Sequence, residues 1–190
     1  MSEKTDRRIH KTKSAIKDSL KELLVSNKLE DITVQKLADE ADITRKSFYN
    51  HYGNLYDVLD EIENDYLDYL FSWIDDVTRF FNTPRQFLIE TVNRLNDTSD
   101  DFLLIARNSD IMRFLRKFTT RQKNVISGKY RQYYEISDFD LENLLTFISS
   151  GTLVVFYNWI NDSGQHSLDD LKDFFIRDQC DVITFSDQPS

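Results

Sequence analysis

Two short helical segments joined by a three-residue turn constrain this 190-residue chain more than any other feature of its sequence. The first covers residues 34–41 and ends at Asp42, and apolar side chains recur in it at helical spacing behind Thr33, a residue suited to the N-cap. The second covers residues 45–52 behind Thr44, which can cap it in the same way. Asp42 tolerates the left-handed conformation that so tight a turn requires. We therefore predict a helix-turn-helix.

The second short segment has the composition of a DNA-recognition helix. Phe48 and Tyr52 are four residues apart and can point together into a core. The other side chains are polar or cationic and could face a groove, where Arg or Lys reads guanine and Asn reads adenine. We predict that four residues face bases: Arg45, Lys46, Ser47 and Asn50. The predicted DNA-binding set is completed by the cap Thr44 and by four phosphate-contacting residues: Thr33, Gln35, Tyr49 and His51.

A longer amphipathic helix is expected before this pair, over residues 9–24. Ile16 and Leu20 lie on its apolar face, together with Leu23 and Leu24. Cationic side chains crowd the opposite face and the arm before it: Lys4, Arg7, Arg8, Lys11, Lys13, Lys17 and Lys21. We expect this stretch to lie near phosphates, although a solvated helix face would look the same.

The distribution of charge agrees with a DNA-binding N-terminus better than the total does. The whole chain carries a net charge of −9. Residues 1–52 contain 11 Lys or Arg and 9 Asp or Glu, for a net charge of +2, whereas residues 53–190 contain 13 and 24, for a net charge of −11. The acidity therefore lies outside the predicted helix-turn-helix and does not exclude nucleic acid as its partner.

The rest of the chain also has helical character, since four Gly and two Pro leave few places for tight turns. Further helices are expected over residues 54–81, from Pro84 onward, and over 101–106, 111–118 and 121–134, with Gly128 weakening the last. We predict an all-α fold of about nine helices. It consists of a three-helix helix-turn-helix domain at residues 1–53, a larger helical effector-binding and dimerisation domain at 54–185, and a disordered tail at 186–190.

Residues 141–160 are apolar around almost the whole helical circumference, so a soluble protein must bury this helix on more than one side. One of those sides is predicted to face another subunit. Gly151 would allow a second helix to approach closely, either within the chain or from a partner. A last helix is expected after a capping box that begins at Ser167.

Other functional classes find little support in the sequence. The N-terminus has no apolar signal core and no run approaches ~18 apolar residues, so we expect a cytoplasmic protein without a membrane span. Three scattered histidines and the single Cys180 offer no metal site, and no nucleophile or phosphate loop suggests an enzyme or a bound cofactor. The high aromatic content, 13%, suits either a Phe-rich core or a cavity for a small-molecule effector.

The stretch ITVQKLADEADITRKSFYNHYGNLYDVL resembles the N-terminal domain of TetR/AcrR-type transcriptional regulators. The match covers about residues 8–60 and keeps every interval of the family pattern through twelve positions: Thr33, Leu37, Ala38, Ala41, Ile43, Thr44, Ser47, Phe48, Tyr49, His51, Tyr52 and Val58. Two positions depart from the pattern. Asp42 replaces the glycine of the turn, and Leu55 replaces a lysine usual at the start of the fourth helix, which puts a phosphate contact there in doubt.

The resemblance implies an all-helical C-terminal domain that forms a homodimer through residues 141–160 and 167–180 and holds an effector pocket. It predicts a ligand-responsive repressor that binds a near-palindromic double-stranded operator, with half-sites ~34–36 Å or a multiple apart. A second hypothesis keeps this fold but makes the chain a protein-interaction adaptor with weak or lost DNA binding. Leu55 and the overall acidity motivate that alternative.

Overall fold

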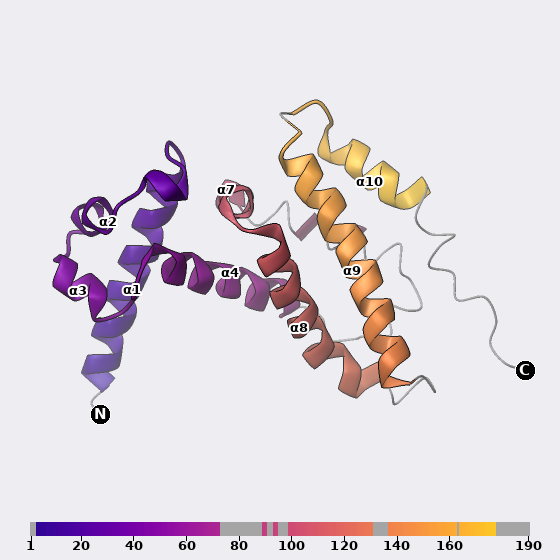
Figure 1. Cartoon of the computed structure of the whole chain (residues 1–190), viewed down its shortest axis with the longest axis horizontal. Coiled ribbons are helices and arrows are strands. Elements are labelled where there is room, and N and C mark those ends of the chain that lie inside the picture. The colour runs from indigo at the N-terminus through magenta and orange to yellow at the C-terminus, as the bar shows by residue number, and fades with distance from the viewer. Residues whose placement is uncertain are drawn as a thin grey trace, which may run out of the picture. The chain divides into compact units, whose positions relative to one another are not determined.

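The computed structural model contains eight α-helices and one 3-10 turn in the part of the chain it describes, with no strand there (Figure 1). An all-helical chain is what the helical spacing and the scarcity of Gly and Pro predict. The described residues are 3–72, 89–90, 93–94, 99–130, 137–162 and 164–177. The helix expected from Pro84, the end of the one expected to reach residue 81, the tail and Cys180 lie outside them.

The contacts divide the chain into two compact units. The first consists of Met1–Tyr66 and Asp100–Asp110, and the second of Leu67–Ser99 and Ile111–Ser190. The boundary between the units falls inside the helix α4 (Leu55–Phe71). The functional division expected at residue 53 stays a prediction, because contacts within one chain do not test it.

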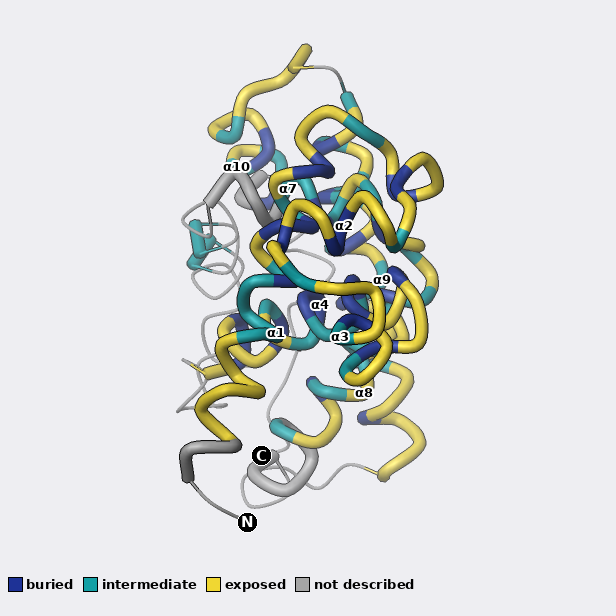
Figure 2. Tube along the Cα trace, turned by 90° about the vertical axis from the view of Figure 1, so that its left-hand side faces the viewer, coloured by how far each residue is buried: buried dark blue, intermediate teal, exposed yellow. Residues whose placement is uncertain are grey.

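The first unit is built on α1 (Glu3–Leu24), the 3-10 turn η1 (Leu29–Asp31), α2 (Val34–Glu40) and α3 (Arg45–Tyr49). Figure 1 shows α2 beside α1 and α3 beside α2, and these pairs are in contact. Their apolar residues form one core with the start of α4, and the core includes the fully buried Ile16, Leu20, Leu37, Phe48 and Val58. Figure 2 shows buried and exposed positions alternating along these helices, as amphipathic spacing requires.

A helix distant in sequence also belongs to this first core. The helix α7 (Ser99–Asn108) contributes the buried Ile105 and the partly buried Leu104 to the core of the N-terminal helices. The sequence pattern predicted a helix at residues 101–106 but gave no sign of where it would pack. The core is therefore larger than a three-helix module.

The turn between α2 and α3 has the predicted caps and the predicted backbone conformation. The hydroxyl oxygens of Thr33 and Thr44 each accept a hydrogen bond from a backbone N–H three residues on, at 3.1 Å in both cases. Asp42 has φ 50, and it is the only non-glycine residue with positive φ among those the structure describes. The Ile43 N–H donates to the Ala38 carbonyl at 2.9 Å and the Asp42 N–H to the Asp39 carbonyl at 3.2 Å, which is a Schellman motif.

Two helices of this motif are shorter than the periodicity indicated. α2 ends at Glu40 and α3 at Tyr49, whereas the apolar pattern continued to residues 41 and 52. The pattern overran because Tyr52, which lies beyond the end of α3, is still buried in the core. A residue in a turn can therefore keep the spacing of the helix before it.

The second unit is built on α8 (Ile111–Tyr130), α9 (Asp138–Ile160) and α10 (Leu168–Arg177). α8 and α9 lie side by side (Figure 1) and are joined by a buried hydrogen bond of 2.5 Å from the Ser149 hydroxyl to the Gln122 side-chain oxygen. α8 is one helix through Gly128, where two separate patterns were expected. The predicted capping box at Ser167 is confirmed, since its hydroxyl accepts from the Asp170 N–H at 3.1 Å and Asp170 accepts from the Ser167 N–H at 2.7 Å.

Candidate nucleic-acid interface

The recognition segment turns two aromatic anchors inward and its polar side chains outward. Phe48 is fully buried and Tyr52 is 6% exposed, as their spacing predicted. Their rings pack against each other with centroids 5.9 Å apart. Because the anchors occupy one side of the segment, the other side is left for contacts outside the unit.

All nine residues predicted to bind DNA reach the surface of the first unit. Seven of them are exposed and Ser47 and His51 are half-buried; the exposed ones are Thr33, Gln35, Thr44, Arg45, Lys46, Tyr49 and Asn50. The structure brings Arg45 and Tyr49 together, with the guanidinium 6.0 Å from the centre of the ring. It also engages Gln35, whose side-chain amide donates to the Asp39 carboxylate at 2.7 Å. Their contacts with DNA remain predictions.

The two capping threonines keep a hydrogen that they can donate. Each hydroxyl oxygen already accepts from a backbone N–H, but a hydroxyl also carries one donor. Thr33 and Thr44 are both exposed, so that donor could reach a phosphate oxygen without loss of the cap.

Only part of the cationic face of α1 is available to phosphates, whereas the sequence predicted that the whole cationic stretch would lie near them. Lys13 and Lys17 form ion pairs with carboxylates of α4, and Lys21 pairs with Asp18 on α1 itself at 3.3 Å. Toward the N-terminus, three cations are exposed and form no ion pair with another described residue: Arg7, Arg8 and Lys11. The side chain of Lys4 lies outside the description. Lys13, Lys17 and Lys21 are therefore held in ion pairs within the first unit.

The ion pairs between α1 and α4 also set the protonation of their members. Burial alone would raise the pKa of Glu61, but the hydrogen bond from Lys13, the nearby Tyr52 hydroxyl and the charges of Lys13 and Lys17 hold that pKa below its usual value. Burial would lower the pKa of Lys17, yet Asp65 and Glu61 raise it overall. Burial, reinforced by the charge of Glu61, raises the pKa of Tyr52. These groups therefore stay in their ordinary charge states at neutral pH.

Leu55, which stands where the TetR/AcrR pattern that the sequence resembles has a lysine, belongs to the core. It is 9% exposed and packs with the other buried residues of the first unit. The start of α4 is instead closed by Asn54 and Asp57. The Asn54 side-chain oxygen accepts from the Asp57 N–H at 3.2 Å, and the Asp57 carboxylate accepts from the Asn54 N–H at 3.2 Å. This reciprocal cap was missed in the sequence, although Asn followed three residues later by Asp was its signal.

No protein-family model matches the sequence, and no curated protein matches it as a relative. Solved structures do match the fold. A TetR transcriptional regulator from Streptococcus agalactiae 2603V superposes with a TM-score of 0.62 at 24% identity, over 90% of this chain and 95% of that one. The dihydroxyacetone kinase operon activator DhaS superposes with a TM-score of 0.60 at 18% identity, over 90% of this chain and 96% of its own. Together with the helix-turn-helix described above, these matches show that the chain has the fold of TetR transcriptional regulators.

Proposed function

We propose that the protein is a transcriptional regulator that binds a near-palindromic operator as a homodimer and responds to a small-molecule effector. The observation that carries this proposal is the recognition segment. Phe48 and Tyr52 hold it to the core while Arg45, Lys46 and Asn50 are exposed on its other side. The regulators of similar fold support it.

The exposed side chains have the chemistry to read a major groove. Arg45 or Lys46 can donate to guanine O6 and N7, and Asn50 can pair with adenine, while Ser47 can contact either kind of base. Tyr49 and His51, with Gln35 and the two capping threonines, can donate to phosphates and so fix the register of the segment on the duplex. The packing of Arg45 on the Tyr49 ring would limit the rotamers of the arginine before DNA arrives.

A second copy of the chain is the proposed partner of α9. One side of this helix is buried through Leu141, Leu145, Leu153, Phe156 and Ile160. On other sides Phe147 is 68% exposed and Val154 40%, and a Cβ placed on Gly151 would meet no atom within 4 Å. α9 is also long and apolar enough to cross a membrane by those two criteria, with 29% of the tested window buried. A subunit interface accounts for the same apolarity, because homodimer interfaces resemble a divided protein core.

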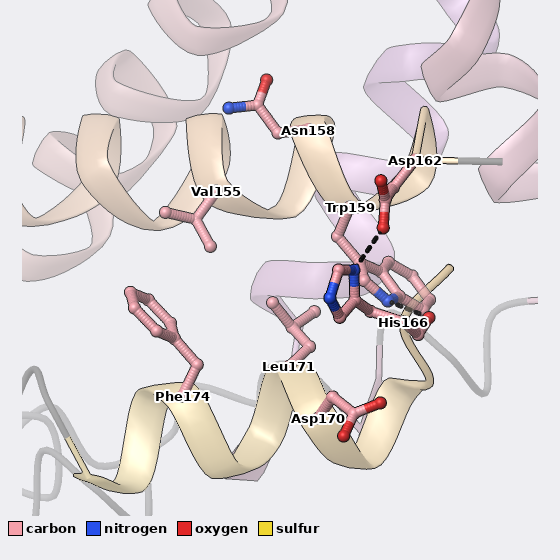
Figure 3. A pocket seen from close by; sticks show the side chains of 8 residues that line it. All are labelled: Val155, Asn158, Trp159, Asp162, His166, Asp170, Leu171 and Phe174. Atoms are coloured by element: carbon pink, nitrogen blue, oxygen red, sulfur yellow. Dashed lines mark hydrogen bonds and ion pairs between the residues drawn. The ribbon is translucent and has the colours of Figure 1, made fainter. Parts of the chain in front are cut away.

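A hollow lies next to this side, between α9 and α10. Val155 and Trp159 of α9 face Leu171 and Phe174 of α10 across a hollow of about 290 Å³ (Figure 3). The Trp159 indole donates to the His166 carbonyl at 3.0 Å, which holds the ring at the end of the hollow. An apolar wall of Val155, Trp159, Leu171 and Phe174 beside the polar Asp162, His166 and Asp170 suits a protein side chain from a partner.

The effector would act by changing the separation of two recognition segments. Half-sites on DNA are spaced by whole turns, ~34–36 Å, so a dimer binds well only when its two segments match that spacing. A ligand that favours another arrangement of the dimer lowers occupancy by its difference in affinity for the two states. Repression follows where the operator overlaps the promoter.

Selection of bound sequences from a random duplex pool by the full-length protein tests this function. We expect an enriched, near-palindromic site whose affinity falls as salt rises, because phosphate contacts release counterions. Absence of both enrichment and salt-dependent binding would reject DNA binding and favour the adaptor with the same fold.

A further inference from the structure

An ion-pair cluster joins α1 to α4 directly behind the recognition segment. We use this name for Lys13, Lys17, Glu61 and Asp65. The Lys13 amine donates to one Glu61 oxygen at 2.6 Å, the Lys17 amine lies 3.5 Å from the other, and Lys17 also pairs with Asp65. Both carboxylate oxygens of Glu61 are therefore engaged by α1, and the side chains of Lys13, Lys17 and Glu61 are at most 33% exposed.

The cluster reaches the recognition segment through Tyr52. The Lys13 amine lies over the Tyr52 ring, 5.1 Å from its centre, so the same cation contacts both this ring and Glu61. The Tyr52 ring packs against Phe48, the central anchor of α3. Its hydroxyl is buried and has no hydrogen-bond partner among the described residues, and the charge of the nearby Glu61 adds to burial in raising the pKa of Tyr52. A chain of contacts thus runs from α4 through Glu61, Lys13 and Tyr52 to α3.

The cluster pairs Lys13 and Lys17, two cations that the sequence predicted to lie near phosphates. Lys11, two residues before Lys13 on the same helix, is exposed and forms no ion pair with a described residue. Lys13 and Lys17 are instead held by carboxylates of the same unit. Glu61 and Asp65 thereby offset two positive charges of a unit whose attraction to DNA would grow with its net positive charge.

We propose that Glu61 and Lys13 are positioning residues for DNA recognition, which hold Tyr52 and hence the recognition segment at the angle that base reading requires. The inference rests on the proposed function. Its consequence is that Glu61, although acidic, favours binding of the correct sequence, whereas Lys13, although basic, contributes nothing to binding of random DNA.

The test uses full-length Glu61→Gln and Lys13→Met, measured against the selected site and against random duplex at several salt concentrations. We expect Glu61→Gln to weaken binding to the selected site about fivefold, the scale of one partly exposed ion pair, although simple removal of an acid should strengthen it. Lys13→Met should weaken the selected site to a similar degree and leave random-duplex affinity and the salt slope unchanged. A lysine that contacts phosphate would instead lower both affinities and reduce the slope by ~1.

Three further variants separate positioning from a general effect. Lys13→Arg keeps the cation and should bind within about twofold of the wild type. The double variant Lys13→Met, Glu61→Gln should lose no more than either single change, because the two residues act as one unit. Glu40→Gln removes an exposed carboxylate that forms no ion pair with a described residue of the same unit, and it should not weaken the selected site.

The outcomes distinguish this inference from the proposed function. If the wild type prefers no sequence over random duplex, the proposed function fails and with it the basis of the inference. If the wild type selects a site but Glu61→Gln binds it as tightly or more tightly, the positioning role is wrong and the function stands. Far-UV circular dichroism and a thermal unfolding curve for each variant show that it is folded at the assay temperature, so a weaker affinity reports on recognition.

Discussion

Among the residues that the structure describes, Asp42 is the one non-glycine residue with a positive φ. Its φ of 50 lies in the left-handed region, where a β-carbon meets steric resistance that glycine avoids. Two hydrogen bonds of the Schellman motif, donated by Asp42 and Ile43, hold the turn closed in spite of that cost. The turn is therefore a place where stability can be gained without altering a contact.

Asp42→Gly is expected to raise the free energy of unfolding by about 0.5–1 kcal/mol, because the relief of strain exceeds the extra entropy that glycine gives the unfolded chain. Asp42→Ala should lower stability, since alanine tolerates this conformation less well than aspartate. Urea denaturation with an unchanged m-value would measure both changes. Equal stability of the glycine and alanine variants would contradict the assignment of strain to this residue.

Arg45 is the recognition residue that we expect to contribute most to sequence preference. Arg45→Ala should weaken the selected site by about 1–3 kcal/mol and relax the preference at one base pair of each half-site. Since Arg45 is exposed, its loss should leave thermal stability nearly unchanged. Lys46→Ala is the comparison, because it removes the neighbouring cation and could act on bases or phosphates; unchanged affinity and preference in both variants would exclude α3 as the reading element.

His166 carries the clearest dependence on pH among the described histidines. Its imidazole lies 2.5 Å from the Asp162 carboxylate, which raises the pKa of His166, with a smaller contribution from Asp170. A folded-state pKa above the unfolded value stabilises the fold at pH below the unfolded value, and that stabilisation is lost as the pH rises through the folded pKa. An NMR titration should show the pKa of His166 falling in Asp162→Asn. Wild type and variant should differ in unfolding free energy at about pH 5.5 and converge at about pH 8.5.

At the scale of elements, α9 shows how far a periodic pattern can be interpreted. Its apolar circumference predicted burial on more than one side, and the structure covers one side while leaving Phe147 and Val154 exposed. The pattern could not tell which side the chain itself would cover, because that depends on α8 packing through Gln122 and Ser149. Contact with a second subunit would account for the apolar residues on the exposed side.

Phe147→Glu is expected to convert the proposed dimer into a folded monomer, because it places a charge in the middle of the proposed interface. Light scattering coupled to size exclusion would measure the mass at several concentrations. Asn124→Glu, on an exposed position of α8, is the matched control and should leave the mass unchanged. A Phe147→Glu protein that keeps the mass of a dimer would remove α9 from the interface.

At the scale of the whole molecule, binding to DNA must overcome a net charge of −9. Residues 1–52 have a positive net charge, but Lys13, Lys17 and Lys21 are already paired within this part. We therefore expect affinity for the selected site to fall at least about tenfold between 50 and 200 mM salt, which corresponds to neutralisation of only a few phosphates. An affinity independent of salt would be incompatible with the phosphate contacts assigned to Tyr49 and His51.

The sequence alone determined the features that depend on neighbours within a few residues. These are the caps at Thr33, Thr44 and Ser167, the left-handed turn at Asp42 and the inward aromatic pair of the recognition segment. Such features are predictable because their hydrogen bonds and spacing close within one or two helical turns. The all-helical fold follows from the same local preferences.

Only the tertiary structure decided which distant segments meet. Lys13 and Glu61 are 48 residues apart, and spacing along either helix does not say that the two will pair. The place of Ile105 in the N-terminal core and the side of α9 left open likewise depend on how whole helices pack. Packing is selected by shape and burial summed over many residues, so it is absent from any single stretch of sequence, and the cluster behind the recognition segment could be recognised only once α1 and α4 were seen together.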